Sequence, residues 1–232
     1  MVLEKIPTFS EVQTWANNNF VDAPLGRISR VNANLSWEVL NFNNLDNWRD
    51  NWSDNSGVSA SLTGRPRRLK ISVDGARTHV SRIISDVLTT HDSLGAFRIT
   101  FKDVSCTKLY QDRLVGVGIR ENNTGGFIKQ STGGDAAIAY YIDSDYDYFS
   151  TTTSNDGTAE MISDMDWGSN HDITIEWDGI DAKLLIDGVL QSSLSHSESA
   201  DYRPSIEIVG LGSDVGGDYD TIKVGEVIVE AL

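Results

Sequence analysis

Three aspartates at alternate positions, Asp143, Asp145 and Asp147, are spaced in a way that could bind a metal ion. A hard cation such as Ca²⁺ takes several oxygen ligands at about 2.3–2.6 Å, and a loop with this spacing could supply a few of them. The segment lacks the glycine and the later glutamate of a helix–loop–helix calcium site. A structural Ca²⁺ is therefore the one cofactor that the sequence suggests, and a solvated acidic hairpin tip is the alternative.

Aromatic residues surround the same aspartates and could bind a glycan. Exposed aromatic rings stack on sugar faces, while nearby amides and carboxylates bind the sugar hydroxyls. The candidate platform consists of Tyr140, Tyr146, Tyr148 and Trp167, with Tyr141, Asp145 and Asn155 close by in the sequence. Tyrosine is also common in strands because of its β-propensity, and tryptophan is more often part of a core. A structural role for these rings therefore stays open.

The other reactive residue types form no catalytic arrangement. Arg65, Arg67 and Arg68 make the one basic cluster, which could bind an acidic glycan or an acidic subunit, or merely offset nearby aspartates. Cys106 is the single cysteine, so an intrachain disulfide and a thiolate zinc site are excluded. No spacing groups the histidines with a nucleophile or a base.

The charge balance excludes some partners. The 232 residues include 34 acidic and 19 basic side chains, for a net charge of −15. No basic face is available to release counterions from a nucleic acid, and no apolar run approaches the roughly 18 residues of a membrane-spanning helix. With 24 Asp but only 7 Lys, the composition resembles that of extremely halophilic proteins and indicates a high-salt environment. Frequent aspartate in turns is the alternative explanation.

One helix precedes the segments that carry these residues. Thr8 and Glu11 fit a capping box, and apolar residues at helical spacing predict an amphipathic helix over residues 8–19. Such a short helix is marginal alone, so residues 1–25 are expected to form an N-terminal arm that anchors the protein or joins copies of it. The start of the chain does not read as a secretory signal.

Beyond residue 35 the sequence changes to short alternating segments separated by turn residues. Strands are expected over 69–73, 80–88, 96–101, 114–119, 136–142, 148–153, 173–177, 206–209 and 222–229. Regular spacing without intervening helices is typical of a sandwich or barrel. We therefore predict an all-β fold, a two-sheet antiparallel jelly-roll sandwich over residues 26–232, behind the short helical arm.

Residues 171–190 carry a family resemblance. A strand that ends at Trp177 turns back at Asp178-Gly179 and returns as a strand that closes with Asp187-Gly188. This resembles the long hairpin of the concanavalin A-like (laminin G-like, lectin and glucanase) jelly rolls. The physics agrees, because Ile173, Ile175 and Trp177 share one strand face and Asp-Gly pairs suit positive-φ turns.

Two further segments are similar to this superfamily, and residues 35–232 are covered in all. Residues 42–48 resemble its opening strand, and residues 217–224 resemble its last strand, which pairs beside the first. The resemblance also implies a structural Ca²⁺ near the terminal strands, to which Asp220 could contribute. Laminarinase-type members carry Glu-x-Asp-x-Glu on one strand, but this sequence lacks the pattern, and its nearest string is Asp164-Met165-Asp166.

Because no catalytic pattern is present, we expect a protein that is not an enzyme. The main hypothesis is a non-catalytic, lectin-like surface protein: a turret, decoration or fibre module in the virion of a halophilic virus that binds host glycans. It would be a homo-oligomer that contacts other virion subunits through its arm, on the virion surface or outside the cell. The alternatives are a secreted carbohydrate-binding module and a polysaccharide-cleaving glycosidase or lyase.

Overall fold

The computed structural model describes thirteen segments of the chain, and every element in them is a strand. The described residues are 27–32, 35–41, 48–50, 58–63, 68–74, 80–85, 96–107, 113–121, 136–143, 146–153, 157–197, 202–210 and 219–232. The predicted helix over residues 8–19 lies outside them, as does the whole predicted arm of residues 1–25. Within the described segments, no helix is long and apolar enough to cross a membrane.

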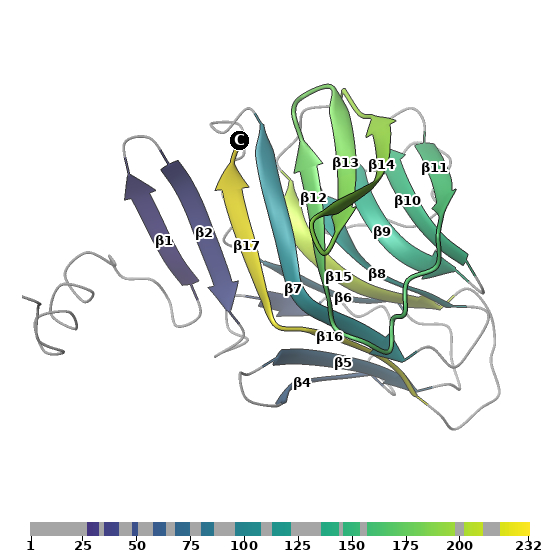
Figure 1. The fold of residues 1–232 in the computed structure, drawn as a ribbon. Helices are drawn as coiled ribbons and strands as arrows, with labels where there is room; N and C mark the ends of the chain where they lie inside the picture. Colours follow the sequence, from purple (N-terminus) through teal and green to yellow (C-terminus); the bar gives the residue numbers. More distant parts are fainter. Residues whose placement is uncertain are drawn as a thin grey trace, which may run out of the picture.

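The strands form two antiparallel sheets that face each other, as predicted (Figure 1). One sheet has the order β1 (Arg27–Asn32), β2 (Leu35–Asn41), β17 (Glu226–Ala231), β7 (Phe97–Thr107), β12 (His171–Trp177), β13 (Asp181–Ile186) and β14 (Val189–Ser195). It continues from β7 through β16 (Tyr219–Val224), β5 (Arg68–Asp74) and β4 (Val58–Thr63). The other sheet has the order β11 (Gly157–Ile162), β10 (Tyr146–Thr152), β9 (Ala137–Asp143), β8 (Arg113–Arg120), β15 (Arg203–Gly210), β6 (Val80–Ser85) and β3 (Trp48–Asp50).

The core lies between the two sheets and is filled by alternate residues of their strands. Ile173, Ile175 and Trp177 of β12 are buried in it, which confirms the face predicted from the sequence. Val117 of β8 and Ile206 of β15 belong to the same cluster on the facing sheet. Complete burial of such a side chain contributes about 1.5–3 kcal/mol, so this alternation is what joins the sheets.

The hairpin of β12, β13 and β14 turns at the two predicted Asp-Gly pairs. Gly179 has φ +95°, Asp187 has φ +50° and Gly188 has φ +79°, values that glycine and aspartate adopt more readily than other residues. Asp187 also accepts hydrogen bonds from the backbone N–H of Asp172 at 2.9 Å and from Nδ1 of His171 at 2.7 Å. The turn is therefore fixed to the start of β12.

These contacts predict a pH dependence of stability. The hydrogen bond from His171, followed by that from the Asp172 N–H, holds the pKa of the Asp187 carboxyl below its usual value of about 3.9. A lowered folded-state pKa stabilises the protein above about pH 4, and this contribution disappears as the pH falls through the lowered pKa. Asp187→Asn, which keeps the positive φ accessible, should therefore lower the urea midpoint at pH 6 but have progressively less effect toward pH 2. A difference that stays constant over this range would contradict the prediction.

The C-terminal segment predicted as one strand over 222–229 forms two strands, because the strand is interrupted at Gly225. The Gly225 N–H donates to the Lys102 carbonyl at 2.8 Å, and a Cβ on this glycine would lie 3.1–3.2 Å from Asp103 and Lys102. β16 pairs with β5 and β7, whereas β17 pairs with β2 and β7. Residues 219–224 are therefore not the last strand, and it is β17 that lies beside β2.

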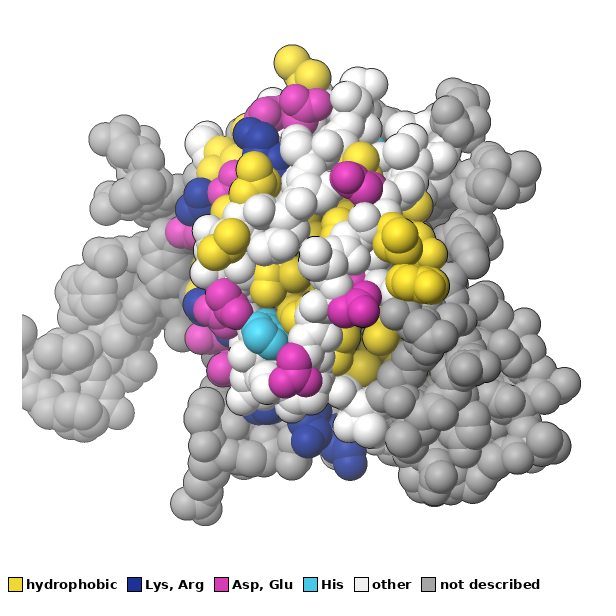
Figure 2. Space-filling model, turned by 45° about the vertical axis from the view of Figure 1, so that its right-hand side comes forward, with side chains coloured by type: hydrophobic (Ala, Val, Ile, Leu, Met, Phe, Trp, Pro, Cys, Tyr) yellow, Lys and Arg dark blue, Asp and Glu magenta, His cyan; other side chains and the backbone are white. Residues whose placement is uncertain are grey.

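The molecular surface over β12–β14 carries acidic, basic and apolar side chains. Figure 2 shows carboxylate side chains scattered across this view, with the basic side chains mainly along its left side and lower end. Exposed apolar side chains are interspersed among them, including Ile180, Val189 and Leu190. Mutual repulsion in such a surface weakens as salt screens it.

Candidate functional site

The seven-stranded sheet has an outer face, turned away from the core, that carries its own side-chain cluster. Because Val115 and Val117 of β8 face the core, Leu114, Gly116 and Gly118 face outward. Leu114 packs there with Ala137, Ala139 and Tyr141 of β9, and Tyr148 of β10 packs against this group. This sheet face, opposite the core, thus has a second cluster of buried apolar residues.

Small residues form the middle of this outer face. A Cβ on Gly116 would lie 2.3 Å from the Tyr140 carbonyl oxygen, and one on Gly118 would lie 2.5 Å from the Ile138 carbonyl oxygen. Neither glycine can carry a side chain without separating β8 from β9. Gly118 pairs with Ala139 of β9, so small residues adjoin one another on the two strands and form the centre of this face.

One side of this centre holds a buried ion pair. Arg120 Nη1 of β8 donates to Glu207 Oε1 of β15 at 3.0 Å, and Ser205 Oγ donates to the same oxygen at 2.7 Å. The side chains of Arg120 and Glu207 are 2% and 0% exposed. Among the described side chains of the outer face, Glu207 is the single carboxylate. In such a pair, which is fully removed from water, the attraction between the two charges offsets their loss of hydration.

The other side of the centre holds tyrosines whose exposure increases from Tyr141, which is buried, to Tyr146. The rings of Tyr141 and Tyr148 stack with centroids 5.6 Å apart and an angle of 20° between their planes. Tyr146 on the same strand is 51% exposed, and Met161 on β11, the register partner of Tyr148, is 57% exposed. Tyr146 and Tyr148 were predicted as sugar-binding residues, and both lie here. The exposed ring of Tyr146 and the partly exposed ring of Tyr148 can stack on a sugar face.

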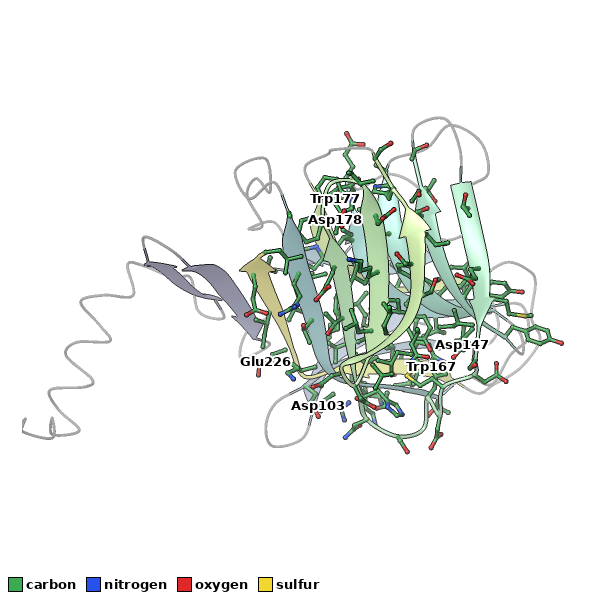
Figure 3. The ribbon with its side chains drawn as sticks, turned by 45° about the horizontal axis from the view of Figure 1, so that its top comes forward. Asp103, Asp147, Trp167, Trp177, Asp178 and Glu226 are labelled. Atoms are coloured by element: carbon green, nitrogen blue, oxygen red, sulfur yellow. The ribbon has the colours of Figure 1, made fainter. Side chains whose placement is uncertain are left out.

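Tyr140 and Trp167, predicted as part of the same platform, lie instead in the interior. Their exposed fractions are 0% and 6%, and their rings stack with centroids 5.1 Å apart. Both donate to the buried Asp147: Tyr140 Oη at 2.7 Å and Trp167 Nε1 at 2.8 Å. Figure 3 shows Asp147 and Trp167 next to each other beneath the strands, far from Trp177. These two rings are core residues and leave Tyr146 and Tyr148 as the surface members.

Asp147 was predicted as a calcium ligand, but its oxygens are occupied within the core. Besides the two ring donors, the Met165 N–H donates to Oδ2 at 2.7 Å. Burial raises the pKa of the Asp147 carboxyl, and these hydrogen bonds oppose the shift. Burial and the neighbouring charge of Asp147 also raise the pKa of Tyr140. The carboxylate therefore anchors the loop that carries Met165 and Trp167.

The rest of the predicted calcium site is not brought together by described side chains. Asp145 lies outside the described residues, and only the backbone of Asp143 and Asp220 is described, in β9 and β16. Among the described side chains, no group of three or more His, Cys, Asp or Glu residues is arranged to hold a metal ion.

The buried pair on the outer face was missed from the sequence. Arg120 and Glu207 are 87 residues apart, and neither is part of a local motif. A signal for Tyr141 was present, because it alternates with Tyr140 and therefore faces the opposite side of the same strand. Strand alternation alone does not say which of the two faces the core.

Several solved structures with a similar fold are glucan-cleaving enzymes. A glycoside hydrolase family 16 endo-glucanase from Bacteroides ovatus matches 82% of this chain and 98% of its own, with 13% identity and a TM-score of 0.59. A lichenase from a mouse hindgut metagenome matches 84% and 99%, with 13% identity and a TM-score of 0.59. The catalytic domain of a laminarinase from Thermotoga petrophila matches 76% and 81%, with 12% identity and a TM-score of 0.54. No family model and no curated protein matches the sequence.

These matches establish that the chain has the concanavalin A-like jelly-roll fold that the hairpin predicted. They also correct the functional hypothesis. The expectation that the chain is not an enzyme rested on the missing Glu-x-Asp-x-Glu pattern, and the hypothesis of a virion protein rested on the lectin-like module and the predicted helical arm. The structural neighbours favour the polysaccharide-cleaving alternative instead.

Proposed function

We propose that this protein is a polysaccharide-cleaving glycosidase that acts on a β-glucan, with the outer face of the seven-stranded sheet as its substrate-binding surface. The observation that carries the proposal is the sandwich shared with the Bacteroides ovatus endo-glucanase along 98% of that chain. The tyrosine strip of Tyr141, Tyr146 and Tyr148 supports the choice of face, because Tyr146 is exposed and Tyr148, which stacks on the buried Tyr141, is partly exposed.

The residues of this face have different roles. The exposed ring of Tyr146 provides an apolar surface on which a sugar can stack. The Arg120–Glu207 pair is buried and stabilises the sheet behind this surface.

A second candidate function is that of a carbohydrate-binding module. Hydrolysis with retention needs two carboxyls about 5–5.5 Å apart, and inversion needs about 6.5–9.5 Å. Glu207 is the one carboxylate among the described side chains of the outer face, and it is buried with Arg120. This observation favours binding, and the same experiment decides between the two functions.

The test measures reducing ends released from laminarin and from mixed-linkage β-1,3-1,4-glucan. Tyr146→Ala should lower kcat/KM about two- to tenfold, the range expected for one lost ring contact, while Tyr146→Phe should keep most of the activity. Ile180→Ala, which removes an equally exposed apolar side chain from another turn, is the matched control and should have no effect.

Three results are informative. Hydrolysis that Tyr146→Ala weakens supports the proposal, including the chosen face. Retention of the protein on both glucans without release of reducing ends supports the binding module instead. Absence of both retention and hydrolysis overturns the proposal.

A further inference from the structure

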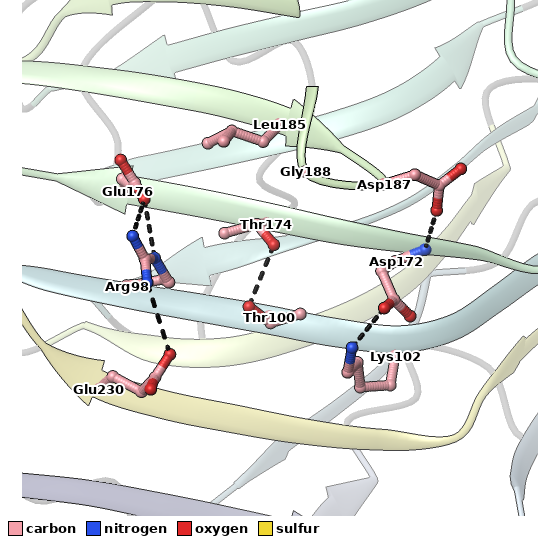
Figure 4. Close-up of a pocket in the computed structure, with 10 residues that line it drawn as sticks. All are labelled: Arg98, Thr100, Lys102, Asp172, Thr174, Glu176, Leu185, Asp187, Gly188 and Glu230. Carbon is pink, nitrogen blue, oxygen red and sulfur yellow. Dashed lines mark hydrogen bonds and ion pairs between the residues drawn. The ribbon is translucent and has the colours of Figure 1, made fainter. Parts of the chain in front are cut away.

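The ten-stranded sheet has a groove on its own outer face, on the side of the sandwich opposite the tyrosine strip (Figure 4). The groove has a volume of about 490 Å³, which lies within the range of about 300–1,000 Å³ typical of ligand sites. It crosses β17, β7, β12 and β13, and the Asp187–Gly188 turn borders one end. We call it the charged groove.

Two neighbouring strands supply the floor of the charged groove. Asp172, Thr174 and Glu176 of β12 alternate with Ile173 and Ile175, which face the core. These three side chains therefore project into the groove. The same alternation on β7 directs Arg98, Thr100 and Lys102 outward, since Ile99 and Phe101 belong to the core. Glu176 is the register partner of Arg98 and Thr174 that of Thr100, while Asp172 meets Lys102 at a β-bulge, so the polar groups meet in pairs.

Each pair joins a donor to an acceptor. Arg98 Nε donates to Glu176 Oε1 at 2.7 Å, and Lys102 Nζ donates to Asp172. Between these two ion pairs, the hydroxyls of Thr100 and Thr174 are 3.0 Å apart. The ion pairs are partly open to water, since the side chains of Arg98 and Lys102 are 41% and 35% exposed.

This arrangement favours a neutral polyhydroxyl ligand. The groove is lined by the two bases and four carboxylates, Asp172, Glu176, Asp187 and Glu230, so it disfavours an anion and offers acceptors to hydroxyl groups. Leu185 is the one apolar side chain among the lining residues. A sugar hydroxyl both donates and accepts, so it can accept from Arg98 or Lys102 and donate to the paired carboxylate. Partly exposed ion pairs are worth only about 0–1 kcal/mol, so sharing their hydrogen bonds with a ligand costs little.

We propose that the charged groove is a second carbohydrate-binding site, which holds a stretch of the same β-glucan chain away from the outer face of the seven-stranded sheet. The inference rests on the proposed function for the identity of the sugar. The Thr100–Thr174 pair lies at the centre of this site and contacts the sugar hydroxyls directly.

The test is retardation of the full chain in native gels that contain laminarin or mixed-linkage glucan, run at 4 °C. The double variant Thr100→Val and Thr174→Val removes both central hydroxyls but keeps the shape of the two side chains. The change is nearly neutral for stability, because neither position is left with an unsatisfied hydrogen-bonding group. Its dissociation constant should rise about tenfold, as expected for two lost hydrogen bonds. The control is Ser72→Ala with Thr221→Val, which removes a similar hydroxyl pair, 3.1 Å apart, from β5 and β16.

Weaker retardation of the groove variant alone, with the control unchanged, supports the site. Equal retardation of wild type and groove variant overturns it, and so does the absence of retardation of any protein by either glucan. The two proposals fail separately: hydrolysis can persist while the groove variant binds normally, and the groove can bind glucan in a chain that releases no reducing ends.

Discussion

Replacing Arg120 by methionine is expected to lower the free energy of unfolding by about 3–5 kcal/mol. Arg120 and Glu207 are fully removed from water and compensate each other's charge across a distance of 3.0 Å. Methionine has a similar length but no charge, so the variant leaves the Glu207 carboxylate buried without its guanidinium partner. Breaking a buried pair from one side is costly because the remaining charge stays desolvated.

Urea unfolding followed by tryptophan fluorescence measures this effect, and two variants control for it. Adding Glu207→Gln to Arg120→Met should recover most of the loss, since the pair is then replaced as a whole and Ser205 keeps an acceptor. Arg98→Met makes the same substitution in the partly exposed Arg98–Glu176 pair and should cost at most about 1 kcal/mol from the pair. Equal losses for Arg120→Met and Arg98→Met would show that burial of the Arg120 pair is unimportant.

Asp147→Asn should cost about 3 kcal/mol, although it changes only one atom. In the wild type, Oδ1 accepts from Trp167, and Oδ2 accepts from both Tyr140 and Met165. An asparagine amide must direct its NH₂ group toward either the Trp167 or the Met165 N–H, so one buried donor faces another. Tyr140→Phe removes a single donor, leaves the other two contacts, and should cost only about 1–2 kcal/mol.

The effect of Asp147→Asn also depends on pH. Burial raises the folded-state pKa of Asp147, so the folded protein takes up a proton at a higher pH than the unfolded chain does. Wild-type stability therefore gains as the pH falls from the raised pKa toward about 3.9, and the asparagine variant lacks this gain. The difference between their urea midpoints should widen over that range. A difference that narrows would show that the carboxylate is favoured, rather than penalised, by its surroundings.

Much of the sandwich was predictable because its signals are local. The 171–190 hairpin has apolar residues at every second position and Asp-Gly at both turns, and its strands, turns and buried face are as expected. The break at Gly225 was missed because alternation continues on both sides of it. What separates β16 from β17 is the close approach of Lys102 and Asp103, which are distant in the sequence.

The alternation and turn residues of the chain indicated an antiparallel sandwich or barrel, and the resemblance of the 171–190 hairpin implied the two-sheet, concanavalin A-like type. Only the tertiary structure decided which tyrosines are available for a sugar. Alternation along a strand assigns residues to its two faces, but it does not say which face another sheet covers. The facing sheet buries Tyr140 with Asp147 and leaves Tyr146 at the surface. Likewise, Arg120 meets Glu207 because β15 pairs with β8, a long-range contact that no segment of the sequence encodes by itself.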